Sequence, residues 1–398
     1  MGSEMTFYER LSTRGVSRRD FLKFCGSTAA VLGLSSTFVP TIASKIAGAS
    51  ESGLTPALWI NGGACTGCTE SIAQAAYPNV AEIVLDFLSL NAAETISMAT
   101  GEYAEGAIDA TVEDGTYILL YEGTVMTGLD GNVLRVGGVP QIEHLEHLAE
   151  HAAVVIAMGS CAVDGGWVIS SPNPAGGMGV SEYLKKKNIK VPVVNLPGCP
   201  VNPEELVAVV VQALLLGADG DLDSGLAGVV KSLDSQGRPG YLYSATIHDS
   251  CPRRGHFENG EFVYKFGSEA EAKKWCLYPV GCKGPQTYRQ CPMLRWNNTQ
   301  SWCVDSGGPC IGCATFNWVD NNAPFRGRMR QVGINSVGEA GLNPATAAAA
   351  VGGVAAVALV AHGFGMKAAG RIGPNATLKD EPMKEYDAKR LKKKGGAK

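Results

Sequence analysis

The sequence predicts an α/β protein with three successive parts, and three observations predict it. Between residues 54 and 216, strand-like apolar runs alternate with turns and amphipathic helix-like runs. Between residues 241 and 335, apolar runs are few and cysteines are frequent. Residues 340–366 contain no Asp, Glu, Lys or Arg. We therefore expect a doubly wound sheet domain, a loop-rich domain organised by metal, and a single apolar helix.

The composition agrees with a globular protein rich in loops. The chain has 398 residues, of which 45% are hydrophobic and 18% are charged, and Gly 50 and Pro 20 are high counts. Many loops around bound groups would account for this excess of glycine and proline. The formal net charge of −4 gives no reason to expect a nucleic-acid partner.

The first element in the chain is an export segment, expected at residues 1–49. The sequence SRRDFLK at residues 17–23 precedes an apolar stretch over residues 24–42, and AGA at residues 47–49 offers a cleavage site. This pattern is typical of a twin-arginine signal, which exports proteins that have already folded around a cofactor. The alternative is a short amphipathic helix with adjacent arginines by chance. Cleavage would remove Cys25 with the signal.

Residues 50–217 are expected to form the sheet domain. The predicted strands are Ala57–Ile60, Tyr117–Tyr121, Ala153–Met158 and Val191–Leu196, and the predicted helices are Thr69–Ala76, Gln141–His151, Ser181–Lys187 and Pro203–Leu216. Strands that are apolar throughout indicate a parallel sheet covered on both faces. We therefore expect a doubly wound, flavodoxin-like architecture.

Three thiols follow the ends of predicted strands in this domain. Cys65, Cys161 and Cys199 stand in LWINGGAC, VVIAMGSC and VVNLPGC. Ligands of open α/β sheets bind outside the carboxyl ends of the strands, so these thiols can converge. Cys68 forms a CxxC pair with Cys65 at a helix start, where the helix dipole favours thiolate. We predict a four-thiolate metal site, since a redox-active CxxC alone would leave Cys161 and Cys199 without a role.

Residues 218–240 are rich in Gly, Asp and Ser and are expected to be a linker, and residues 241–335 contain seven further cysteines. These cysteines and one histidine form two more groups of four: His248, Cys251, Cys276 and Cys282, then Cys291, Cys303, Cys310 and Cys313. His248 completes a group that is one thiol short, whereas we expect His256 to be an ordinary surface or core residue. The irregular spacing favours iron–sulfur clusters over compact zinc knuckles.

Two other uses of the cysteines are possible. A framework of five disulfides would leave one free thiol and would not explain the two CxxC spacings. A structural zinc protein anchored to a membrane would be colourless, whereas an iron–sulfur protein is brown. The sequence favours iron.

The last element is the uncharged stretch 340–366, which is long enough for a transmembrane helix of ~20 residues. Residues 367–398 contain ten Lys/Arg against four Asp/Glu, which predicts a basic tail on the cytoplasmic side. An Ala/Gly-rich soluble helix is the alternative. His362 is expected to be an idle helix-end residue.

Six motifs together resemble the small subunit of a membrane-bound nickel–iron hydrogenase, of the NiFe or NiFeSe kind. They are CTGCTES at 65–71, GSCA at 159–162, PGCP at 197–200, HDSCPRRGHF at 248–257, CLYPVGCKGP at 276–285 and PCIGC at 309–313. The resemblance runs from the export signal through about residue 335. It implies that H2 is oxidised at a nickel–iron site on a separate large subunit and that this chain contributes no catalytic residue.

The resemblance also implies the cofactors. A proximal [4Fe–4S] cluster would lie on Cys65, Cys68, Cys161 and Cys199, a distal [4Fe–4S] cluster on His248, Cys251, Cys276 and Cys282, and a medial cluster between them. The position of Cys303 is usually proline in this family, with a three-iron medial cluster. Because a fourth thiol is available here, we expect a medial [4Fe–4S] cluster on Cys291, Cys303, Cys310 and Cys313, with [3Fe–4S] as the alternative.

The resemblance further implies partners and a location. The expected partners are the large subunit, the lipid bilayer, and a membrane cytochrome b with quinone or a periplasmic cytochrome c as electron acceptor. The globular part is expected to face the periplasm or the cell exterior from the cytoplasmic membrane. A relative of the small cluster-bearing quinone-reductase component of respiratory complex I is the main alternative, although such a protein would not need the ligands after residue 240.

Overall fold

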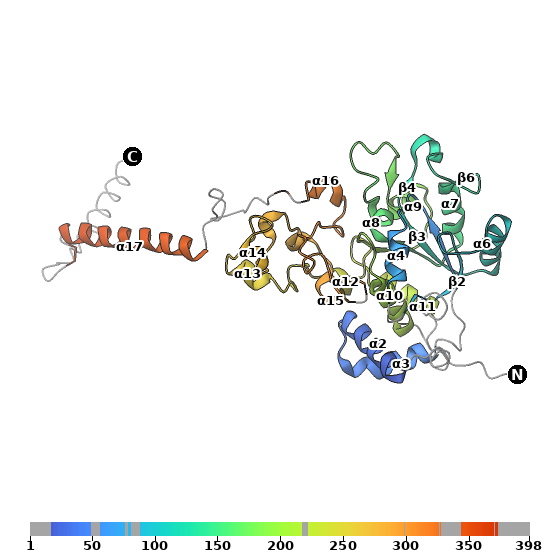
Figure 1. The fold of residues 1–398 in the computed structure, drawn as a ribbon, viewed down its shortest axis with the longest axis horizontal. Coiled ribbons are helices and arrows are strands. Elements are labelled where there is room, and N and C mark those ends of the chain that lie inside the picture. Colours follow the sequence, from blue (N-terminus) through green and yellow to red (C-terminus); the bar gives the residue numbers. More distant parts are fainter. Residues whose placement is uncertain are drawn as a thin grey trace, which may run out of the picture. The chain divides into compact units, whose positions relative to one another are not determined.

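The computed structural model of the protein describes residues 17–48, 56–75, 79–80, 88–216, 222–297, 299–325, 327, 344–369 and 371–372. The chain divides into two units, Met1–Met329 and Arg330–Lys398. The first unit contains a sheet, the helices around it and the cysteine-rich segment, and the second contains one long helix (Figure 1).

A five-stranded parallel sheet forms the centre of the first unit. Its order is β2-β1-β3-β7-β9, with bounds β2 Ser89–Ala93, β1 Pro56–Asn61, β3 Ile118–Glu122, β7 Val154–Met158 and β9 Val193–Leu196. Two small antiparallel pairs accompany it, β4 Val125–Met126 with β8 Gly177–Met178 and β5 Arg135–Val136 with β6 Val139–Pro140. The predicted α/β class with a parallel sheet is therefore confirmed. The four predicted strands correspond to β1, β3, β7 and β9.

The sheet is covered on both faces, as the continuous apolar strands predict. Leu58, Leu119 and Val155 lie in register across β1, β3 and β7 and belong to one buried cluster. The next residue of each strand belongs to a second cluster, because successive side chains of a strand point to opposite faces. Two helical layers therefore enclose the sheet.

Each face has its own helices. Helices α7 (Gln141–His151) and α9 (Val180–Lys186) contribute to the cluster that contains Leu58. Helices α10 (Pro203–Leu216) and α11 (Leu222–Lys231) contribute to the other cluster. The remaining helices of this part are α4 Gly67–Ala73, α6 Glu102–Asp114 and α8 Gly159–Asp164, with the 3-10 turn η3 Gly128–Gly131.

Helix α11 lies inside the segment 218–240, which was expected to be a linker. The Gly, Asp and Ser residues suggested a connection, but Leu226 and Val229 are buried in the cluster that contains α10. Apolar residues at helical spacing therefore form a short amphipathic helix there in spite of the composition.

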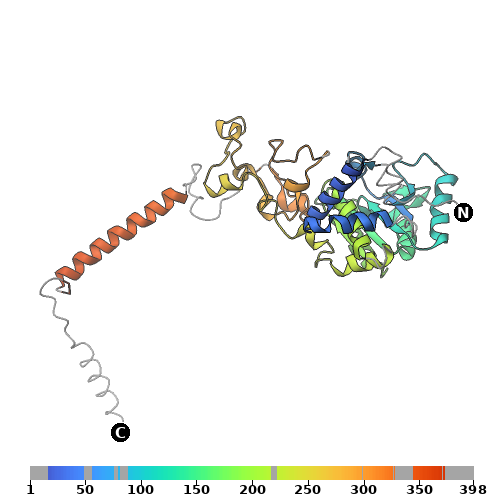
Figure 2. The same cartoon turned by 90° about the horizontal axis from the view of Figure 1, so that it is seen from below.

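The N-terminal segment, residues 17–48, also folds onto the sheet domain. Helix α2 (Arg18–Val31) begins at Ser17, whose side chain accepts a hydrogen bond from the Asp20 N–H at 3.2 Å, and α3 (Val39–Gly48) follows the 3-10 turn η1 (Ser36–Phe38). Cys25 and Ile42 are fully buried in the cluster that contains α10. Figures 1 and 2 both place α2 and α3 beside α10.

The segment from residue 240 to residue 325 consists of short helices and loops. Its elements are α12 Gly240–Tyr243, α13 Arg254–Glu258, α14 Glu269–Ala272, η5 Tyr278–Val280, η6 Gly284–Gln286, α15 Cys291–Leu294 and α16 Trp318–Asn322. Its small core includes Cys291 and Cys310 beside Trp302 and Val263. The thiols are thus part of the core of this segment.

Helix α17 (Pro344–Ala368) belongs to the second unit. Its part Ala350–Ala368 is long and apolar enough to cross a membrane, with a mean hydropathy of 1.4. It corresponds to the predicted span 340–366, whose residues 340–343 lie outside the described residues. Most of the predicted basic tail lies outside them as well.

Candidate metal centres

We call Cys65, Cys68, Cys161 and Cys199 the first group, and they come from three segments that follow strands at one edge of the sheet. Cys65 follows β1 at the start of α4, Cys161 lies in α8 directly after β7, and Cys199 follows β9. The carboxyl ends of parallel strands meet at one edge, so the topology brings the four together.

A buried carboxylate holds the helix that carries Cys68. Glu122, at the end of β3, accepts hydrogen bonds from the N–H of Cys68 at 3.0 Å, the N–H of Thr69 at 3.2 Å and the hydroxyl of Thr69 at 2.6 Å. Thr66, the residue before α4, makes no capping bond through its side chain. Glu122 therefore satisfies two of the free N–H groups of the first turn. Its position after an apolar strand was the signal in the sequence, and sequence reasoning missed it.

Burial favours the protonated form of the Cys68 and Cys199 thiols in the absence of metal. Burial raises the pKa of the Cys199 thiol to about 12, and the nearby thiols of Cys313, Cys161 and Cys65 add to the rise. Burial also raises the pKa of Cys68 well above its ordinary value. Since thiolate is the metal-binding form, a bound metal has to displace these protons.

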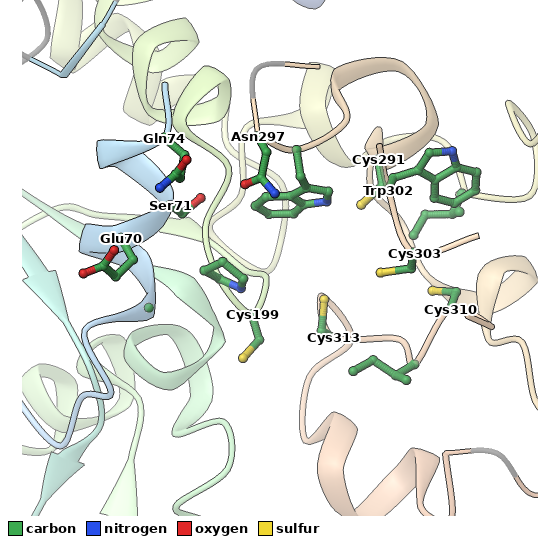
Figure 3. A pocket seen from close by; sticks show the side chains of 15 residues that line it. Glu70, Ser71, Gln74, Cys199, Cys291, Asn297, Trp302, Cys303, Cys310 and Cys313 are labelled. Atoms are coloured by element: carbon green, nitrogen blue, oxygen red, sulfur yellow. The ribbon is translucent and has the colours of Figure 1, made fainter. Parts of the chain in front are cut away.

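The third group consists of Cys291, Cys303, Cys310 and Cys313. All four line one cavity of about 360 Å³, together with Cys199 of the first group. Figure 3 shows the four side chains of the third group around one part of this cavity, with α4 on the other side of Cys199. The structure therefore brings the third group together and places it against the first.

Ser160 ties the first and third groups to each other. Its side chain accepts a hydrogen bond from the N–H of Gly198 at 2.8 Å and donates one to the carbonyl oxygen of Cys313. It is 1% exposed and precedes Cys161 in the chain. One hydroxyl thus joins the loops of Cys161, Cys199 and Cys313.

Arg289 lies at the same junction. Its Nη1 donates to the sulfur of Cys313 at 3.8 Å, and its Nη2 donates to the carbonyl oxygen of Pro200 at 3.3 Å. Its Nε and Nη2 are also paired with the two carboxylate oxygens of Glu205, each at 2.7 Å, and both side chains are 1% exposed. This bidentate ion pair is neutral overall and fixes the guanidinium of Arg289 between the first and third groups.

The second group consists of His248, Cys251, Cys276 and Cys282. Burial raises the pKa of the Cys276 thiol to about 12, and Cys282 and Cys251 add to the rise, so these three thiols lie within each other's electrostatic reach. Burial and the charge of Arg254 lower the pKa of His248. This shift favours the neutral imidazole, which is the form that binds metal.

The second group adjoins the third. The N–H of Lys283, the residue after Cys282, donates to the carbonyl oxygen of Cys310 at 2.8 Å. The third group therefore lies between the other two. His256 is paired instead with Glu261 at 2.6 Å.

The cysteines are free thiols, so the disulfide framework has no support. No three His, Cys, Asp or Glu side chains among the described residues lie close enough together to hold a single metal ion. All twelve predicted ligands are among those described residues.

Comparison with known proteins identifies the family. Residues 243–326 match the family described as the C-terminal part of the NiFe/NiFeSe hydrogenase small subunit. Residues 65–213 match the family described as "NADH ubiquinone oxidoreductase, 20 Kd subunit". The uptake hydrogenase small subunit of Azotobacter vinelandii is 38% identical over 362 residues, which cover 90% of this chain and 94% of that protein. The chain belongs to the NiFe hydrogenase small subunits.

Other relatives agree. The periplasmic [NiFe] hydrogenase small subunit 1 of Nitratidesulfovibrio vulgaris is 38% identical over 80% of this chain and 95% of its own length. The quinone-reactive Ni/Fe-hydrogenase small chain of Wolinella succinogenes is 37% identical over 79% of this chain and 85% of its own length. The solved [NiFeSe] hydrogenase of Desulfovibrio vulgaris Hildenborough aligns with a TM-score of 0.65 and 33% identity, over 69% of this chain and 98% of that chain.

This hydrogenase small subunit is the electron-transfer subunit of an oxidoreductase whose small subunits pair with a large subunit. The likeness to the ubiquinone oxidoreductase subunit is confined to the sheet domain, so the complex I alternative does not account for residues 243–326. The hydrogenase small subunit that matches 90% of this chain favours the hydrogenase family over the complex I component.

Proposed function

We propose that this small subunit relays electrons from H2 oxidation at the large-subunit nickel–iron site through three iron–sulfur clusters. The observation that carries the proposal is the order of the three ligand groups. Cys199 of the first group lines the cavity of the third group, and the third group is hydrogen-bonded to the second through the N–H of Lys283 and the carbonyl oxygen of Cys310. This order supports a path that enters at a proximal cluster, crosses a medial one and leaves from a distal one.

The ligands fit iron–sulfur clusters by their chemistry. Eleven thiols and one imidazole supply three sets of four donors, and a cluster on each set would take up and release single electrons. The chain's own residues do the rest: buried loops hold the donors in place, and Ser160 and Arg289 fix the junction between the first and third groups.

We propose that the medial cluster is [4Fe–4S] and that Cys303 is its fourth ligand. Cys303 lines the same cavity as Cys291, Cys310 and Cys313. The residue as a whole is exposed, but its side chain lies at the cavity beside Cys310 and Cys313 (Figure 3). A [3Fe–4S] cluster on the other three thiols is the alternative.

The domain boundaries and the location are also proposals. Residues 50–217 would form a flavodoxin-like domain, since the sheet has the strand order of that fold, and residues 241–335 would form the domain of the distal and medial clusters. Residues 1–49 would direct twin-arginine export, α17 would anchor the complex, and the tail 367–398 would remain cytoplasmic.

The name of the quinone-reactive relative favours a membrane cytochrome b and quinone over a periplasmic cytochrome c as the electron acceptor. Relatives of both the NiFe and the NiFeSe kind match, so the large subunit is expected to be of one of these two kinds.

The experiment that tests the proposal is metal analysis and EPR spectroscopy of the purified, air-oxidised heterodimer. We expect about twelve irons outside the nickel site and no near-isotropic signal of an oxidised three-iron cluster. A strong signal of that kind would assign the medial centre to the three-iron alternative. A colourless protein with zinc in place of iron would overturn the electron-transfer proposal.

A further inference from the structure

Arg253 is a buried cation that joins the loops of the second and third groups. Its side chain is 8% exposed. Its Nη1 donates to the carbonyl oxygen of Trp275 at 3.0 Å, and its Nη2 donates to that of Val304 at 2.9 Å. Trp275 precedes Cys276 of the second group, and Val304 follows Cys303 of the third. The guanidinium therefore lies between two loops that carry thiols of different groups.

Within the described part of the chain, no Asp or Glu lies within the 4.0 Å of Arg253 that defines an ion pair. Asp305, next to Val304, is paired with Arg295 at 3.0 Å. Two carbonyl oxygens only partly replace the water that a buried guanidinium has lost. A buried charge is costly unless an anion compensates it.

Arg289, at the junction of the first and third groups, differs from Arg253 because a carboxylate compensates its charge. Its charge is cancelled by Glu205, with which it forms two bonds of 2.7 Å. It can therefore hold loops in place without adding net charge. Arg253 brings a net positive charge to its own junction.

The second group is the nearest source of compensating negative charge once it binds a metal centre. Arg253 follows Cys251 by two residues in the chain, and its Nη1 is bonded to the carbonyl oxygen of Trp275, the residue before Cys276. The guanidinium therefore lies beside the backbone that carries two of the three thiols of the second group.

We propose that Arg253 is a positioning residue that raises the reduction potential of the centre bound by the second group. The inference rests on the proposed function, because it requires a cluster on His248, Cys251, Cys276 and Cys282. Reduction adds one negative charge to a cluster, and a nearby buried cation stabilises that charge more than water-screened charges do. The two carbonyl bonds keep the cation at the junction.

The test is an EPR-monitored redox titration of the heterodimer with Arg253→Gln, Arg253→Lys and wild-type chains. Glutamine can still donate to a carbonyl oxygen but has no charge, whereas lysine keeps the charge. We expect Arg253→Gln to change the one-electron equilibrium constant of the distal centre about tenfold, which lowers its potential by about 59 mV. We expect Arg253→Lys to stay within about threefold of the wild type, which is about half of that shift or less.

Lys187→Gln is the matched control, because it removes one positive charge from a side chain that is 45% exposed and paired with Glu146 at 2.9 Å. It should leave the distal potential unchanged, since water screens an exposed charge. Lys283, which is also buried beside Cys282, is retained in every variant.

A fully loaded Arg253→Gln heterodimer with the wild-type distal potential would overturn the inference. If Arg253→Gln does not retain its iron, Arg253→Lys decides: a wild-type potential supports the role of the charge, and a tenfold change contradicts it. Iron analysis of the wild type comes first. A wild type without clusters would refute the proposed function, whereas a loaded wild type with an unresponsive Arg253→Gln would refute this inference alone.

Discussion

At the residue scale, Cys303 is the thiol on which the type of the medial cluster depends. It lines the cavity of the third group, yet it is the one thiol of that group whose residue is exposed. A ligand at the edge of a site can be lost while the other three still hold a cluster. Cys303 therefore differs in its expected role from the buried Cys310.

We predict that Cys303→Pro converts the medial cluster to the three-iron form. The oxidised heterodimer should then show a near-isotropic EPR signal that the wild type lacks, and the iron content should fall by one. Cys310→Ser is the contrasting variant, because removal of a fully enclosed ligand should lose the whole medial centre. An unchanged spectrum and iron content in Cys303→Pro would show that Cys303 binds no iron.

Glu122 is the second residue on which a prediction rests, because it is 2% exposed and caps α4. We predict that Glu122→Ala lowers the stability of the heterodimer by about 1–3 kcal/mol for each N–H that it leaves unsatisfied. The measurement is the midpoint of thermal unfolding, with iron content determined alongside. Glu182→Ala removes an exposed carboxylate paired with Lys186 and should change the midpoint little. Equal midpoints for both variants would argue against a capping role.

Much of the ligand set could be predicted from the sequence, whereas the residues that support it could not. Cys65, Cys161 and Cys199 follow apolar strands, so the topology of a parallel sheet places them at one edge. Arg253 and Ser160 have no such pattern. Their roles depend on loops that approach from distant parts of the chain, and those contacts appear only in three dimensions.

At the element scale, the fold could be predicted where apolar periodicity was strong. Helices α7 and α10 have the predicted bounds, and β7 is buried throughout. Strand β2 and helix α6 were missed. The sequence SLNAA of β2 is short and partly polar because it lies at the edge of the sheet, and α6 is acidic with few buried residues. An element with few buried residues, such as β2 or α6, has few apolar residues at regular spacing, so its pattern in the sequence is weak.

Helix α17 has the opposite character, because its apolar side chains are exposed. Val354, Val357 and Leu359 are each more than two-thirds exposed. An apolar helix without a protein partner among the described residues requires another apolar environment, and a bilayer supplies one.

We predict that Val357→Arg weakens the membrane association of the heterodimer. Arginine at the centre of a spanning helix costs about 2.5–3.5 kcal/mol. The measurement is the fraction of hydrogenase that stays with the membranes after an alkaline carbonate wash. Val357→Leu is the matched control and should behave as the wild type does. If the wild type itself washes off, α17 does not anchor the protein.

At the scale of the whole molecule, the proposed twin-arginine export would require the clusters and the large subunit to be acquired before transport. The N-terminal segment is compatible with this order. Its apolar helices α2 and α3 bury Cys25 and Ile42 against the sheet domain, while Arg18 and Arg19 stay exposed. If the proposed export holds, a folded chain would present the arginine pair to the export machinery while the apolar part of this segment is shielded from water.

We predict that Arg18→Lys combined with Arg19→Lys blocks export without preventing assembly. The charge is unchanged, but lysine lacks the planar, multiply donating guanidinium that a specific receptor reads. The heterodimer should accumulate with its leader uncleaved on the cytoplasmic side, with the iron content of the wild type. Cell fractionation and immunodetection of both subunits measure this. Lys23→Arg, at an exposed position of the same helix, should be exported normally. Export of the double variant at the wild-type level would mean that residues 1–49 are not a twin-arginine signal. Clusters would then have to be assembled outside the cytoplasm or protected during transport in another way.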